Sequence, residues 1–194
     1  GKLRNSRQNV AVYGRPLPKL FYGVGISGDA SDPEGVEAST TTLRLAYDIF
    51  PSLTIGALSV NGTCDANAGN CLVNRKYSRN AIDLQSEIAG FTFNAVVLSA
   101  KDDNATATAS VENNAFYIQA LYNVKDGVRT SWVPLARIDS YEKNGGSEKV
   151  NELTLSVHYY ITENVRSMLE FWNKDSDVNT NDDDRLTFQV IAAF

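Results

Sequence analysis

The chain has 194 residues, of which 43% are hydrophobic and 21% are charged, and its formal net charge is -5. This composition excludes a disordered or fibrous chain, and the negative charge without a basic cluster excludes a nucleic-acid binder. No stretch approaches the roughly 18 uninterrupted apolar residues of a membrane-spanning helix, whereas one crossing of a β-barrel needs only about 9 to 11 alternating residues.

Alternation of apolar and polar residues, the pattern of a β-strand whose two faces meet different surroundings, recurs along the chain. The strands predicted from it lie near residues 8–15, 20–28, 39–49, 52–61, 80–89, 91–101, 114–124, 129–141, 150–161, 165–173 and 184–194. The fold class is therefore all-β and antiparallel, with about eleven strands.

Two kinds of connection alternate between these strands. Short turns are expected at 15–19, 50–52, 89–90, 125–127 and 162–164, and long polar loops near 28–38, 61–79, 101–113, 142–150 and 174–184. Minimal turns at one end and elaborated loops at the other are typical of transmembrane β-barrels with periplasmic turns and extracellular loops.

The only two cysteines, Cys64 and Cys71, lie in one of the predicted loops, within a segment rich in turn-forming residues. A disulfide that closes this loop is predicted, and it suits an oxidising compartment such as the periplasm or the cell surface. Two unpaired thiols are the alternative. Zinc is not expected, because the chain has a single, distant histidine.

The polar faces of the predicted strands carry charges of both signs. Alternation alone does not distinguish a soluble β-sandwich, whose polar face looks outward, from a barrel, whose polar residues line a lumen. Aromatic residues near strand ends, charges in mid-strand and acidic loops favour the barrel. The residues predicted to line the pore are Arg44, Asp48, Asp83, Glu87, Arg137, Asp139, His158, Arg166 and Glu170.

No catalytic site is predicted. His158 and Ser156 share one strand face, but a lipase also needs an orienting third group at the lipid boundary. Asp83 and Glu87 are separated by roughly 13 Å along a strand, too far for the carboxylate pair of a retaining glycosidase. We therefore expect a protein that is not an enzyme and has no cofactor.

An acidic segment near the end of the chain resembles the start of a calcium loop, because Asp175, Asp177, Asn179 and Asp183 alternate through it. The segment lacks the glycine and the closing glutamate of an EF-hand. It is a weak candidate for a surface calcium site, and a solvated acidic loop is the alternative. No other metal site is predicted.

The last predicted strand ends on Phe194 and resembles the final strand of bacterial outer-membrane barrels, whose assembly machinery reads an aromatic terminus. Such barrels almost always have an even number of strands, so an odd count needs an explanation. We expect this chain to be the carboxy-terminal part of a larger barrel. A complete ten-stranded barrel with residues 1–19 outside the wall is the alternative.

Residues 110–194 resemble the last strands of the phosphate-selective porins of the O/P type. The segments that carry the resemblance are 115–123, 132–137, 153–161, 162–164, 165–170 and the terminal strand. The resemblance implies a homotrimeric, water-filled channel of about sixteen to eighteen strands, embedded in outer-membrane lipid and lipopolysaccharide. Phosphate selectivity is not implied, because it depends on inward arginines and lysines, whereas this sequence is acidic.

Three functions are compatible with this pattern. The first is a porin of the bacterial outer membrane, through which small hydrophilic solutes or ions diffuse passively. The second is a barrel that encloses a lumenal or periplasmic protein partner, such as an electron carrier or a lipoprotein. The third is a soluble, secreted β-sandwich that binds a ligand.

Overall fold

The computed structural model describes residues 9–28, 38–64, 75–103, 110–127, 129–178 and 182–192. No helix in this described part of the chain is long and apolar enough to cross a membrane. In chain order the strands are β1 (Asn9–Leu17), β2 (Leu20–Gly28), β3 (Ala38–Phe50), β4 (Leu53–Cys64), β5 (Arg75–Ile88), β6 (Phe91–Asp102), β7 (Val111–Tyr122), β8 (Val124–Asp126), β9 (Arg129–Lys143), β10 (Glu148–Tyr160), β11 (Val165–Ser176) and β12 (Asp183–Ala192).

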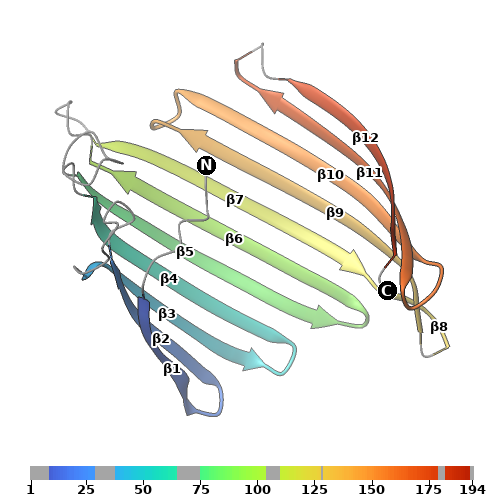
Figure 1. Ribbon diagram of the computed structural model, residues 1–194, viewed down its shortest axis with the longest axis horizontal. Coiled ribbons are helices and arrows are strands. Elements are labelled where there is room, and N and C mark those ends of the chain that lie inside the picture. Colours follow the sequence, from blue (N-terminus) through green and yellow to red (C-terminus); the bar gives the residue numbers. More distant parts are fainter. Residues whose placement is uncertain are drawn as a thin grey trace. The chain divides into compact units, whose positions relative to one another are not determined.

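The strands form one sheet in which hydrogen-bonded neighbours follow one another in chain order, from β1 to β7 and then from β9 to β12, while β8 pairs with β9. The pairs within β1–β4 and within β8–β12 are antiparallel (Figure 1). This arrangement confirms the all-β antiparallel prediction. It disagrees with the β-sandwich alternative, in which the strands divide between two packed sheets.

Contacts divide the chain into two compact units. The first unit comprises Gly1–Ile82 and Leu98–Asn114, and the second comprises Asp83–Val97 and Ala115–Phe194. Strands β1 to β4 belong to the first unit and β8 to β12 to the second.

Some strands extend farther than the sequence predicts. β5 begins at Arg75, β6 continues to Asp102 and β7 begins at Val111. The polar ends of these strands lack the alternation of apolar residues on which the prediction depends, and the sequence therefore predicts loops there. β8 is an additional strand of 3 residues, too short for an alternating pattern to reveal it.

The connection between β9 and β10 is a tight turn, although the sequence suggests a longer loop there. Both strands extend into the range 142–150 and leave only residues 144–147 to join them. Asn144, Gly145 and Gly146 all have positive φ, which asparagine and glycine adopt more easily than other residues. The turn is therefore built from the residue types that its backbone requires.

Large apolar side chains are exposed rather than buried. Among the described residues, the only buried hydrophobic ones are Ala46, Ala100 and Val133. By contrast, Leu186 is 72% exposed and Phe188 is 70% exposed. Because a water-soluble domain of this size buries its large apolar side chains, a nonaqueous environment must cover this surface.

Candidate functional site

Strand register in the second unit defines a polar face on β9–β12. Directly paired residues of antiparallel strands point to the same side of the sheet. Thr154 of β10 is paired with Arg137 and with Trp172, and Trp172 is in turn paired with Arg185. By the same register this polar face also holds Asp139, Glu152, Ser156, His158, Tyr160, Arg166, Met168, Glu170, Lys174, Asp183, Thr187 and Gln189.

The opposite side of the same strands is the apolar face of the second unit. Leu155 is paired with Phe171, and Phe171 with Leu186 on the next strand. Val157 and Leu169 form the neighbouring pair, and all five side chains are exposed. Exposed apolar residues on one face and charges on the other match a sheet with lipid on one side and water on the other.

Arg137 is held by two neighbours on the polar face. Its Nε and Nη2 atoms donate to the Asp139 carboxylate at distances of 2.6 to 3.0 Å. Its guanidinium carbon lies 4.5 Å from the centre of the Tyr117 ring. A bidentate ion pair together with a cation–π contact fixes the orientation of the guanidinium and places a negative charge beside it.

Trp172 connects two charged residues on the same face. Its Nε1 atom donates to Glu152 Oε2 at 3.1 Å, and the guanidinium carbon of Arg185 lies 5.2 Å from the centre of its ring. Arg185 Nη2 is also 3.5 Å from Asp183 Oδ2. Neither Trp172 nor Arg185 is among the predicted pore residues, although alternation along β11 and β12 places both residues on the polar face.

In the first unit, Asp48 lies on the side of β3 opposite the exposed Leu43 and Leu45, and this side is the polar face of the unit. At its turn end, Asp48 accepts hydrogen bonds from two side chains. It is paired with Thr54 of β4, whose Oγ1 donates to Asp48 Oδ1 at 2.8 Å. Arg15 Nη1 donates to Asp48 Oδ2 at 2.6 Å. The predicted pore residue Asp48 is therefore one half of an ion pair, and its partner comes from the end of β1.

Arg44 lies on the same face of β3 as Asp48, between Gly23 of β2 and Leu58 of β4. A Cβ atom added to Gly56 would lie only 2.6 Å from Arg44 Cζ. The guanidinium therefore occupies the space above a residue that has no side chain. Glycine at position 56 allows this arginine to lie along the sheet.

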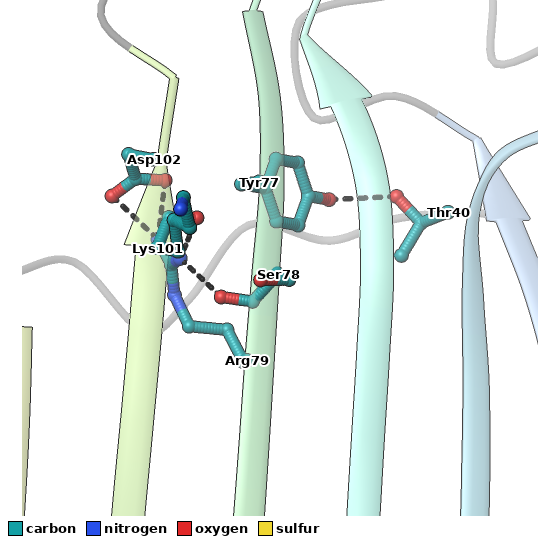
Figure 2. Close-up of polar contacts among 6 residues, drawn as sticks. All are labelled: Thr40, Tyr77, Ser78, Arg79, Lys101 and Asp102. Atoms are coloured by element: carbon teal, nitrogen blue, oxygen red, sulfur yellow. Dashed lines mark hydrogen bonds and ion pairs between the residues drawn. The ribbon is translucent and has the colours of Figure 1, made fainter. Parts of the chain in front are cut away.

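Arg79 and Asp102 form a second bidentate ion pair, between β5 and β6 (Figure 2). Arg79 Nη2 donates to both Asp102 oxygens, at 2.8 and 2.9 Å, and Nη1 donates to the main-chain oxygens of Ser78 and Lys101 at 2.8 and 3.2 Å. The sequence does not predict this pair, because the alternation that marks the predicted strands stops before Arg79 and Asp102, and both residues fall in predicted loops. The alternation of β5, continued toward its start, puts Arg79 in phase with Asp83.

Tyr77 reaches across β4 to β3, where its hydroxyl lies 2.7 Å from Thr40 Oγ1 (Figure 2). Gly62 of β4 is paired with Thr40. A Cβ atom at position 62 would lie 2.5 Å from Tyr77 Oη and 2.7 Å from Thr40 Oγ1. The contact between Tyr77 and Thr40 therefore depends on the absence of a side chain at Gly62.

This dependence predicts the effect of Gly62→Ala. The added methyl group should displace Tyr77 from Thr40 and lower the free energy of unfolding by about 1–2 kcal/mol. Gly25→Ala is the matched control, because a Cβ atom there would meet only ordinary contacts, with Ala11 Cβ nearest at 3.6 Å. Urea titration of the lipid-reconstituted variants measures both values, and equal stability of the two variants would contradict the assignment.

Asp83 and Glu87 are two further predicted pore residues, and both lie in β5. Asp83 is half-buried and Glu87 is exposed, and Ser86 between them is buried. Exposure thus does not alternate regularly along β5 from Ile82 to Ile88. Their location on the polar face stays a prediction.

The predicted calcium ligands do not converge on one point in the part of the chain that the structure describes. Asp183 is paired with Lys174 on the polar face, whereas Asp175 follows Lys174 and points to the other side. Asn179 lies outside the described residues. Within the described ranges, no group of three or more His, Cys, Asp or Glu residues is placed to hold a metal ion.

The predicted disulfide also falls on residues that the structure does not describe. Cys71 lies outside the described ranges, and of Cys64 only the backbone, at the end of β4, is described. The disulfide therefore stays a prediction. The terminal Phe194 likewise lies outside these ranges.

An antiparallel sheet with an exposed apolar face and a charged opposite face defines the wall of a transmembrane β-barrel. The chain belongs to the family of the phosphate-selective porins O and P, whose family model matches residues 60–193. The match confirms the resemblance seen in the sequence and extends it toward the amino terminus. A comparison with curated proteins found no match.

Solved structures of a porin and of another outer membrane protein share the fold. An anion-selective porin from Comamonas acidovorans superposes with a TM-score of 0.70 at 11% identity, over 87% of this chain and 49% of the porin. A loop-deletion mutant of OmpT, an outer membrane protein of Vibrio cholerae, gives a TM-score of 0.71 at 13% identity, over 95% of this chain and 62% of that chain. The trimer form of OmpT gives 0.62 at 15% identity, over 87% and 54%. The chain thus spans about half to three fifths of these proteins.

Proposed function

We propose that the chain forms part of the wall of an outer-membrane porin, through which small hydrophilic solutes and ions diffuse passively. The observation that carries this proposal is the contrast between the two faces of β9–β12. Leu155 and Phe171 are exposed on one side, whereas Arg137, Asp139 and Glu152 lie on the other. Lipid on the first side and water on the second satisfy both sets of side chains.

The polar faces are proposed to line the lumen. Their charged and aromatic groups form a hydrated surface along which a solute exchanges hydrogen bonds as it moves. The predicted pore residues Arg44, Asp48, Arg137, Asp139, His158, Arg166 and Glu170 would contribute to this lining. Arg15, Arg79, Asp102, Trp172 and Arg185 are added to them by their contacts.

The charge pairing favours weak ion selectivity in this part of the wall. Arg15, Arg79 and Arg137 each form an ion pair with a carboxylate at 2.6 to 2.8 Å. A paired arginine presents little net positive charge to a passing anion, because the nearby carboxylate cancels most of its field in water. The phosphate selectivity in the family's name is therefore not assigned to these residues.

Location and assembly are proposed on the same basis. The family and its structural relatives support an outer-membrane protein and a channel rather than an enzyme. The trimer form of OmpT supports a homotrimer. Outer-membrane lipid and lipopolysaccharide are then the molecules expected around the apolar faces.

Conductance of the full-length protein in planar bilayers tests the porin proposal. We expect stepwise increases in current on insertion, with an ohmic current–voltage relation at low voltage, since the proposed lumen is hydrated. Protein that inserts into the bilayer and leaves it electrically sealed at every concentration would contradict the proposal. The control is the current across a planar bilayer that receives the same preparation without folded protein.

A further inference from the structure

The apolar faces carry polar side chains near the ends of the strands that lead into the loops. In the first unit, Asn61 is paired with Thr41 on the side opposite Arg44. Asn61 Nδ2 donates to Ser59 Oγ at 3.1 Å, and Ser59 Oγ donates to Asn80 Oδ1 at 2.8 Å. Three neighbouring strands therefore carry a hydrogen-bonded band of amides and hydroxyls on their apolar side.

The second unit has the same kind of band. Ser140 Oγ donates to Asn151 Oδ1 at 2.9 Å, and Asn173 Nδ2 donates to Asp184 Oδ1 at 2.6 Å. Asn61, Asn80, Asn151 and Asn173 lie about nine or ten residues from the turn ends of their strands, the length that a tilted strand needs to cross the hydrocarbon layer. The band thus falls where acyl chains end and headgroups begin.

In the first unit a hollow of about 410 Å³ adjoins this band. Its lining includes Thr41, Asn61, Lys76, Ser78, Lys101 and Asp103. Tyr77, Arg79 and Asp102 point to the polar face, so their alternating neighbours point to the apolar side. Seven of the nine residues that line the hollow therefore belong to the side that meets lipid, and the other two are Gly62 and Tyr77.

We propose that this hollow binds the headgroup of a phosphorylated glycolipid whose acyl chains lie against the apolar face. The proposal rests on the proposed function, since it requires the apolar face to lie in a membrane. Lys76 and Lys101 supply positive charge for phosphate, and Thr41, Asn61 and Ser78 exchange hydrogen bonds with sugar hydroxyls. The acyl chains then continue onto the apolar face.

Two carboxylates narrow the choice of ligand. Glu112 Oε1 lies 3.1 Å from Lys101 Nζ, and Asp103 is part of the lining of the hollow. These acids weaken the attraction for a simple anion, because they offset the charge of the lysines. They also accept hydrogen bonds from hydroxyl groups, so a headgroup with both phosphate and sugar fits the hollow better than phosphate alone.

Lipid binding to the full-length protein in detergent micelles tests this inference. The probes are lipopolysaccharide, dephosphorylated lipopolysaccharide, phosphatidylglycerol and inorganic phosphate, and native mass spectrometry measures the bound molecules. We expect the wild-type protein to bind lipopolysaccharide best. The double variant K76Q/K101Q should bind lipopolysaccharide about tenfold more weakly, since each lysine near an anionic headgroup contributes severalfold to affinity.

The control variant is K19Q/K125Q, which removes two exposed lysines near the turn ends of the strands. It should bind lipopolysaccharide like the wild-type protein. Unchanged binding by K76Q/K101Q, or equal loss in both double variants, would overturn the inference. A cysteine introduced at Ser78 that cross-links to a second copy, and not to lipid, would also overturn it.

Bilayer conductance of the same variants separates this inference from the porin proposal. K76Q/K101Q should conduct like the wild-type protein, because the two lysines lie outside the proposed lumen. If the wild-type protein bound lipopolysaccharide through these lysines but never conducted, the porin proposal would be contradicted. The proposal of a headgroup site would still be supported.

Discussion

Phe188→Arg should severely impair assembly into lipid bilayers. Phe188 lies in the middle of β12 on the apolar face, opposite Leu169, and is 70% exposed. An arginine at the middle of a lipid-facing strand costs about 2–4 kcal/mol, a large part of a protein's stability. We expect the folded fraction in lipid vesicles to fall sharply, as measured by urea titration and heat-dependent gel mobility.

Thr187→Arg is the matched control for this variant. Thr187 is the preceding residue of β12, but it lies on the polar face and is paired with Glu170. An arginine there meets water and a nearby carboxylate, so the free energy of unfolding should change by less than about 0.5 kcal/mol. If Phe188→Arg were as stable as Thr187→Arg, the side chain of Phe188 would face water and the membrane assignment would fail.

Asp102→Asn and Asp139→Asn should each make the channel more anion-selective. Each substitution keeps the size of the side chain but removes the charge that compensates Arg79 or Arg137. An uncompensated guanidinium in a wet lumen attracts anions by up to about 1 kcal/mol, so the anion-to-cation permeability ratio should rise roughly twofold to fivefold. Reversal potentials in a potassium chloride gradient measure this ratio.

Two comparisons make this selectivity test specific. The effect should shrink at high salt, because mobile ions screen charges in water. Asp126→Asn, a change of an exposed carboxylate in the short strand β8, should leave the ratio nearly unchanged. A shift toward cations in Asp102→Asn, or equal shifts in all three variants, would show that these ion pairs do not line the conduction path.

The sequence predicts the strands and the two faces well, because a period of two determines on which side of a strand each residue lies. In β10, for example, alternation predicts that Ser156 and His158 share one face, which puts Leu155 and Val157 on the other. The register with β11 confirms this division. The family was also recognisable from the last strands, and its model matches residues 60–193.

The partners of the charged residues were not predictable in the same way. Alternation shows which face a residue occupies, but the neighbour across the sheet depends on the register between strands, which one strand does not encode. The sequence predicts Arg79 and Asp102 in separate loops, and only the longer β5 and β6 bring them together. The spaces above Gly56 and Gly62 follow from the same cross-strand geometry.

A nitroxide scan along β10 tests the central claim most directly. Single cysteines at residues 153–158 of the full-length protein in lipid bilayers would carry the label, and collisions with oxygen and with a water-soluble nickel chelate would be measured. We predict that Leu153, Leu155 and Val157 favour oxygen, which concentrates in lipid, whereas Thr154, Ser156 and His158 favour the nickel chelate. Equal access of the nickel chelate to both sets of positions would contradict a wall between lipid and water.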